Sequence, residues 1–328
     1  MSARDRITEA IEANDLDEFV RVVDGLVEAG EWELLVELRD RARLALERGR
    51  QLWPVASLAE YRLALDAPAR YAAIVLVEGA GRFAPGPLAE VAASTHTWGE
   101  LAPHVVPGPA AALAAHERVV RGERVDAAGV AHAEVLAVPL TLAPWEPDYA
   151  VAEYRPDRVE EPAPAIRRGR PLSLPEDPPL RFPDPDVEPA LRDLVRGWTA
   201  ASEGTARVAS VRGDAAAAIA ALGVRDVRAA WLDVPEALAV LAWAGASGGR
   251  HGRRRGAAAG RDAAWAAVAA LAGYPPGELP DARTLGAALD ELRWYAWQAP
   301  DAHTGWVLRV AVEDPAEGLA WALDATDR

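Results

Sequence analysis

The stretch from residue 245 to residue 265, GASGGRHGRRRGAAAGRDAAW, holds the side chains best suited to chemistry. Guanidinium groups bind phosphate and carboxylate in a bidentate manner, and glycine amides can form an anion-binding nest. The stretch leads into an expected helix near residue 262, whose N-terminus also favours negative charge. A small phosphate- or carboxylate-bearing ligand is therefore one expected occupant, while a partner contact and a plain solvated connection are the alternatives. The candidate anion-binding residues are Arg250, His251, Arg253, Arg254, Arg255 and Arg261.

A second reading of the same stretch is nucleophilic catalysis. Residues 245–249 fit the pattern G-x-S-x-G, in which Ser247 would be the nucleophile of a serine hydrolase. That chemistry needs a strand before the serine and a helix after it, whereas the residues before Ser247 have a helical pattern. No HGGG-like oxyanion segment precedes it either. A serine hydrolase using Ser247 stays an alternative.

Histidine, metal and cofactor chemistry has little support in this sequence. The six histidines show no H-E-x-x-H or similar spacing, so we expect no metal site. Asp301 and His303 lie together between two expected strands and form a possible secondary site. The sequence has no lysine, which excludes a Walker A loop, and prolines at 85 and 87 prevent the helix that a dinucleotide fingerprint at 79–84 would need. We therefore expect no cofactor.

Composition limits the classes of function further. The chain has 328 residues, a formal charge of −15 at pH 7 and no cysteine, so no disulfide is possible. The negative charge opposes binding to nucleic acid. No apolar run is long enough to cross a membrane, and the first residues lack the apolar core of a signal peptide. We expect an acidic, alanine-rich cytoplasmic protein.

The elements that must position these residues fall into three parts. Residues 1–154 are predicted to form a mainly helical domain. Asp15 has the position of a helix N-cap, and Phe19, Val22, Val23 and Leu26 then form one apolar stripe. A second helix is expected after Gly30. Its sequence overlays the first at a shift of 16 residues, which predicts a helical hairpin like the unit of an α-solenoid.

Residues 155–189 carry ten prolines and are predicted to be a linker between domains or a strap across one of them. Residues 190–328 are predicted to form an α/β or α+β domain with about four strands, at 206–212, 226–234, 293–298 and 305–314. Asp314, Pro315 and Glu317 resemble a helix start, which predicts a final helix over 317–325.

The whole chain is thus expected to be a mixed α+β protein. The expected function is that of a non-enzymatic protein that binds another protein or regulates one, because the helical region and the proline-rich segment suit contact surfaces. An enzyme or sensor that binds a small anionic ligand at 250–261 is the first alternative, and the serine hydrolase is the second.

Overall fold

The computed structural model describes residues 3–13, 15–45, 52–177, 179–300 and 305–328. The chain forms two compact units. The first unit contains Met1–Val135 and Ala152–Glu161, and the second contains Leu136–Val151 and Pro162–Arg328. The chain therefore passes between the units three times. Residues 136–151 belong to the second unit, and residues 152–161, which follow them, belong to the first.

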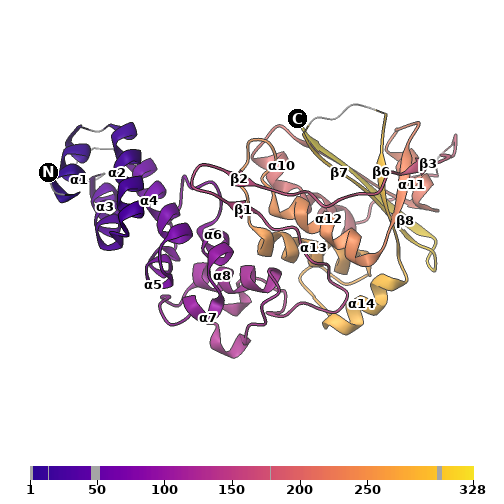
Figure 1. Ribbon diagram of the computed structural model, residues 1–328. Helices are drawn as coiled ribbons and strands as arrows, with labels where there is room; N and C mark the ends of the chain where they lie inside the picture. The colour runs from indigo at the N-terminus through magenta and orange to yellow at the C-terminus, as the bar shows by residue number, and fades with distance from the viewer. Residues whose placement is uncertain (1–2, 14, 46–51, 178, 301–304) are drawn as a thin grey trace. The chain divides into compact units, whose positions relative to one another are not determined.

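The first unit is helical apart from one short hairpin (Figure 1). Its strands β1 and β2 pair in antiparallel fashion. Its elements are α1 (Ala3–Ala13), α2 (Leu16–Ala29), α3 (Trp32–Leu44), α4 (Trp53–Asp66), α5 (Ala69–Ala72), η2 (Ala73–Val75), α6 (Leu88–Thr95), α7 (Trp98–Leu101), α8 (Pro109–Val120), η3 (Ala127–Gly129), η4 (Ala133–Val135), β1 (Glu153–Tyr154) and β2 (Val159–Glu160).

Helix α2 follows directly from its sequence. The Asp15 carboxylate accepts hydrogen bonds from the amides of Asp17 and Glu18, which satisfies two of the four free N–H groups at the helix start. The predicted stripe of four apolar side chains is buried. Gly30 ends the helix with a φ of 68°, and α3 begins two residues later, as expected for the hairpin.

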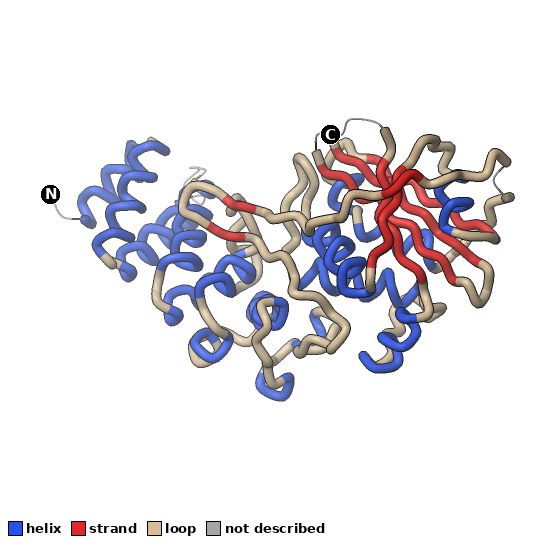
Figure 2. The backbone as a smooth tube through the Cα atoms, turned by 45° about the vertical axis from the view of Figure 1, so that its right-hand side comes forward, coloured by secondary structure: helices blue, strands red, loops and turns tan. Residues whose placement is uncertain are grey.

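The second unit contains a six-stranded antiparallel sheet with the order β3-β5-β6-β7-β8-β4. Figure 2 shows these strands as one twisted sheet, drawn in red. The elements of this unit are β3 (Arg170–Pro171), α9 (Val187–Leu194), α10 (Arg196–Ala200), β4 (Thr205–Arg212), α11 (Ala215–Ala221), β5 (Arg228–Leu232), α12 (Val234–Ala246), α13 (Ala257–Leu271), α14 (Ala282–Asp290), β6 (Arg293–Gln298), β7 (Trp306–Asp314) and β8 (Leu319–Asp327).

Both faces of the sheet are buried, because alternate residues of each strand belong to different cores. In β8, Trp321 and Leu323 belong to the core that contains α9, α12, α13 and α14. Ala320 and Ala322 belong to a smaller core under α11. The larger core includes two fully buried tryptophans, Trp198 and Trp265. The predicted mixed α+β class is thus confirmed, with six strands in the sheet where the sequence predicted about four.

The predicted final helix is wrong, since residues 319–327 form strand β8 between β7 and β4. Asp314 does cap the amides of Ala316 and Glu317, but it does so within a hairpin turn. Gly318, with a φ of 63°, then directs the chain back along β7. A residue in this left-handed conformation ends a turn and cannot continue a helix. Pairing with two strands outweighs the local helix signal.

The proline-rich segment is divided between the units at Glu161. Residues 162–189 belong to the second unit, where β3 pairs with β5 and Arg181 forms an isolated bridge to Val211. The structure therefore packs this part of the segment along the two edges of the sheet. Short strands that contain proline are typical of sheet edges.

Candidate functional site

The glycine-rich loop between α12 and α13 is tightly packed. A Cβ atom on Gly252 would lie 2.2 Å from the carbonyl oxygen of Gly248 and 2.9 Å from that of Gly197. A Cβ atom on Gly260 would lie 2.2 Å from the carbonyl oxygen of Ala242, because α12 and α13 are in backbone contact there. Close backbone approach therefore explains these glycines without a ligand.

Arg261 is fully buried and paired with a buried carboxylate. Its Nε lies 2.7 Å from Oε2 of Glu146, and its Nη2 donates to Oε1 of the same residue at 2.8 Å. It also donates to the carbonyl oxygens of Pro139 and Thr141 at 2.7 and 2.9 Å. Arg261 thus ties α13 to the segment 136–151, and its guanidinium is not exposed to an external anion.

The Glu146 carboxylate has three further donors. The indole of Trp265 donates to Oε2 at 3.0 Å, the Tyr149 hydroxyl donates to the same oxygen at 2.6 Å, and the Ala143 amide donates to Oε1 at 2.8 Å. Burial alone would raise the pKa of Glu146, but the hydrogen bonds and charge of Arg261 hold that pKa below its ordinary value. Burial and the neighbouring carboxylate raise the pKa of Tyr149. The cluster is a structural ion pair that stays charged.

Ser247 lies in a context that differs from a nucleophile elbow. It is the C-cap residue of α12, so it follows a helix where the elbow needs a strand. Its hydroxyl is buried, accepts a hydrogen bond from the indole of Trp198 at 2.7 Å and donates to the carbonyl of Ala244 at 3.3 Å. These contacts favour a packing role for Ser247.

The other candidates of the loop do not share one site. Arg250, His251 and Arg253 are exposed, and Arg254 is buried. The amide of Arg250 donates to Oδ2 of Asp327 at 2.6 Å, which fastens the loop to the end of β8. Asp301 and His303 lie outside the described residues.

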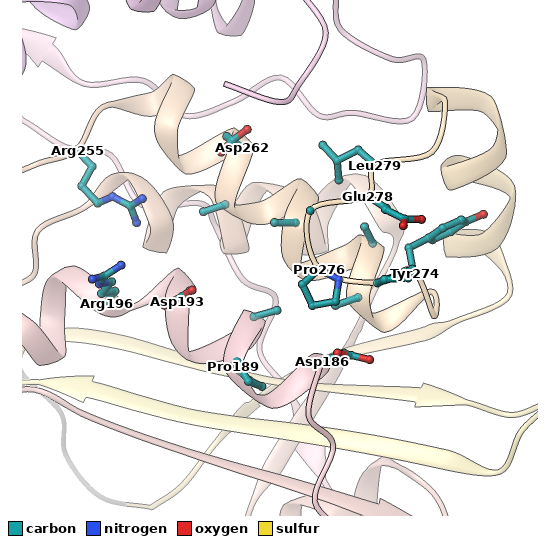
Figure 3. A pocket seen from close by; sticks show the side chains of 17 residues that line it. Asp186, Pro189, Asp193, Arg196, Arg255, Asp262, Tyr274, Pro276, Glu278 and Leu279 are labelled. Carbon is teal, nitrogen blue, oxygen red and sulfur yellow. The ribbon is translucent and has the colours of Figure 1, made fainter. Parts of the chain in front are cut away.

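Arg255 lines a groove of about 360 Å³ along α9 and α13 (Figure 3). Small side chains of α13, together with Ala190 of α9, form an apolar surface within it. The lining residues are Asp186, Pro189, Ala190, Asp193, Arg196, Arg255, Asp262, Ala263, Ala266, Ala269, Ala270, Tyr274, Pro275, Pro276, Gly277, Glu278 and Leu279.

Local turn chemistry shapes one wall of the groove. The Tyr274 amide donates to the carbonyl of Ala269 at 3.0 Å and Gly273 has a φ of 82°, so α13 ends in a Schellman motif. Residues 275–278 then form a turn in which the Glu278 amide donates to the carbonyl of Pro275 at 3.0 Å. Pro276 and Gly277, with φ at 85°, suit the two central positions of a type II turn.

The groove contains two guanidinium groups that have no partner among the described residues. Figure 3 shows Arg196 and Arg255 at the same end, with their guanidinium groups turned toward each other. Neither side chain has an ion pair or hydrogen bond within the part of the chain that the structure describes. Asp193 lies beside them in the same view. Two cations that face each other repel, and an anion placed between them would remove that repulsion.

Sequence reasoning found Arg255 and missed Arg196, together with the remaining groove residues. Nothing in the sequence of residues 187–200, which form α9 and α10, shows which helix α9 packs against. The local signal that was available is the turn sequence Pro275-Pro276-Gly277, which predicts a fixed wall at the end of α13.

A buried polar cluster in the first unit has internal partners. Tyr154 donates to Oε2 of Glu90 at 2.6 Å, Arg121 donates to Oε2 of Glu117 at 2.9 Å, and Nε2 of His116 lies 2.8 Å from the carbonyl oxygen of Ala133. These contacts join β1 to α6 and α8 to η4. Among the described residues, no group of three or more His, Asp or Glu side chains could hold a metal ion.

The fold and the groove define a mixed α+β protein with a helical unit, an antiparallel sheet unit and a charged groove beside that sheet's helices. Residues 17–328 match the family described as "Family of unknown function (DUF6183)", and the chain belongs to that family. No curated protein and no solved structure matched the chain. No helix within the described ranges is both long and apolar enough to span a membrane.

Proposed function

We propose that the second unit is a binding module whose groove takes a small ligand through an anionic group, a carboxylate or a phosphate. The observation that carries this proposal is the pair of guanidinium groups of Arg196 and Arg255 at one end of the groove, which have no partner in the part of the chain that the structure describes. Guanidinium forks suit both anions, and the groove volume lies at the lower end of the range for small-molecule sites.

Of the candidate anion-binding residues in 250–261, this proposal keeps only Arg255. Arg261 is committed to Glu146, and Arg250, His251, Arg253 and Arg254 do not line the groove. A sensor or carrier needs only such a site, whereas an enzyme also needs a nucleophile or a general acid and base. Ser247 does not line the groove. A cytoplasmic location, in keeping with the lack of cysteine, belongs to the same proposal.

Native mass spectrometry of protein purified at low salt from its own host tests the proposal. We expect a small-molecule adduct that is absent from the double variant Arg196→Ala/Arg255→Ala and present in the control Arg250→Ala, whose side chain does not line the groove. NMR signals of the arginine Nε–H groups should also shift in a saturable manner on titration with inorganic phosphate. An adduct that persists in the double variant would overturn the proposal.

A protein partner for the first unit is the second candidate function. Leu16 and Val20 are 53% and 45% exposed and lie four residues apart, on the same face of α2. Exposed apolar side chains at this spacing suit contact with another protein. We expect a larger adduct in the same mass spectra, lost in Leu16→Glu/Val20→Glu and retained when Arg196 and Arg255 are replaced. A bare monomer mass would remove this candidate.

A further inference from the structure

The two ends of the groove carry opposite charges. Figure 3 shows Arg196 and Arg255 at one end, and Asp186, Tyr274 and Glu278 at the other. The Asp186 and Glu278 carboxylates form no ion pair or hydrogen bond with another described residue. No basic side chain lines the groove at that end. A cation bound there would interact favourably with both carboxylates.

The part of the groove between these ends is apolar. Ala190, Ala266, Ala269 and Ala270 line it, and they place no charge or long side chain between the two ends. Apolar contact stabilises a ligand here in proportion to the area removed from water, while the charged ends determine its orientation.

We infer that the ligand is zwitterionic and that its anionic group lies at Arg196 and Arg255 while its cationic group lies at Asp186 and Glu278. This inference rests on the proposed function, because it keeps the anionic group at the same arginines. Asp262, at the N-terminal end of the part of α13 that lines the groove, does not compete for the cation in the same way, because its Oδ1 accepts a hydrogen bond from the Ala137 amide at 2.8 Å.

The run of α13 along the groove sets the scale for the separation of the two charged ends. The lining residues of α13 run from Asp262 to Ala270, and eight residues of helix rise by about 12 Å. An extended peptide advances by about 3.3 to 3.6 Å per residue, so three or four residues cover about 10 to 14 Å. A free peptide of this length, with small side chains, has an ammonium and a carboxylate at the required distance.

Tetraalanine and its two blocked forms test this inference by isothermal titration calorimetry at low ionic strength. The N-acetylated form lacks the ammonium, and the C-amidated form lacks the carboxylate. Each blocked form loses one charge-assisted interaction, so its dissociation constant should be about tenfold higher than that of the free peptide. The free peptide should be the tightest of the three.

Substitutions of exposed residues test the two ends of the groove separately. The variant Asp186→Asn/Glu278→Gln should weaken tetraalanine about tenfold and leave the N-acetylated peptide unaffected. The variant Arg196→Ala/Arg255→Ala should weaken both peptides. Glu203→Gln, an exposed acid outside the groove, should change neither.

Each result that contradicts the inference has its own meaning. If the N-acetylated peptide binds as tightly as the free peptide, the ligand needs no cation, so the inference fails and the proposed function stands. If phosphate binds in an arginine-dependent manner and no peptide binds, the inference again fails and the proposed function stands. If neither phosphate nor peptide binds, both proposals fail.

Discussion

Arg261 of α13 and Glu146 of the segment 136–151 form an ion pair in which both side chains are almost inaccessible, with exposures of 1% and 0%. The pair joins residues 115 positions apart in the sequence, both within the second unit. It explains why a segment with little regular structure is held against α13. It also removes Arg261 from the residues available to a ligand.

The first prediction concerns the removal of one partner of this pair. Arg261→Ala leaves the buried Glu146 carboxylate without its guanidinium, and an uncompensated buried charge costs about 3 to 5 kcal/mol. Urea denaturation should show a loss of this order in the free energy of unfolding. The control Arg250→Ala removes an exposed side chain and should change it by less than about 0.5 kcal/mol. A similar, small loss for both variants would contradict the structural role of Arg261.

The second prediction concerns pH. The pKa of Glu146 is lower in the folded protein than its ordinary value of 4.5, so the folded state favours the ionised carboxylate. Its contribution to stability is therefore present above pH 4.5 and decreases as the pH falls through the lower, folded pKa. The difference in unfolding free energy between the protein and Glu146→Gln should shrink over that acid range. A difference that grew on acidification would contradict the assignment.

The third prediction uses two glycines in helices. Gly260→Ala forces a Cβ atom to within 2.2 Å of the Ala242 carbonyl, and we expect a loss of about 1 to 3 kcal/mol or more as α12 and α13 move apart. Gly25 lies inside α2 with nothing within 4 Å of an added Cβ. Gly25→Ala should therefore stabilise the protein by about 0.5 to 1 kcal/mol, as helix propensity predicts. Thermal unfolding measures the stability of both variants. Shifts of the melting temperature in the same direction would contradict the close contact between α12 and α13.

Local signals predicted those elements whose ends are set by a single side chain. Asp15 caps the start of α2 and Gly30 ends it, as the sequence predicted. The same reasoning failed at Asp314, since a capping aspartate serves a hairpin turn as well as a helix. The hairpin forms here and not a helix because residues 319–327 pair with strands that include one distant in the sequence, β4.

The candidate site was harder to predict for the same reason. A cluster of arginines in the sequence indicated an anion site, yet Arg255 meets Arg196 only because α9 packs beside α13. Arg261, six residues further along the chain and inside α13, is turned into the core. Residue type therefore indicated the region, and tertiary packing decided which arginine is available.

The fourth prediction concerns Ser247. A fluorophosphonate reagent should not label the folded protein at this position, because the hydroxyl is buried and hydrogen-bonded to Trp198. Ser247→Ala should instead lower the free energy of unfolding by about 1 to 3 kcal/mol, since the buried indole N–H loses its acceptor. Ser247→Thr, which keeps the hydroxyl, serves as the comparison. Labelling of Ser247 under native conditions would restore the hydrolase hypothesis.

The last prediction concerns Asp193, which lies beside Arg196 and Arg255 in the groove without an ion pair to either. Its carboxylate repels any anion bound between these arginines. Asp193→Asn removes that repulsion and changes the volume of the side chain little, so phosphate and tetraalanine should both bind more tightly, by about two- to tenfold at low salt. The gain should fall as salt is added, because the groups are exposed to solvent. Weaker binding in this variant would mean that Asp193 itself contacts the ligand.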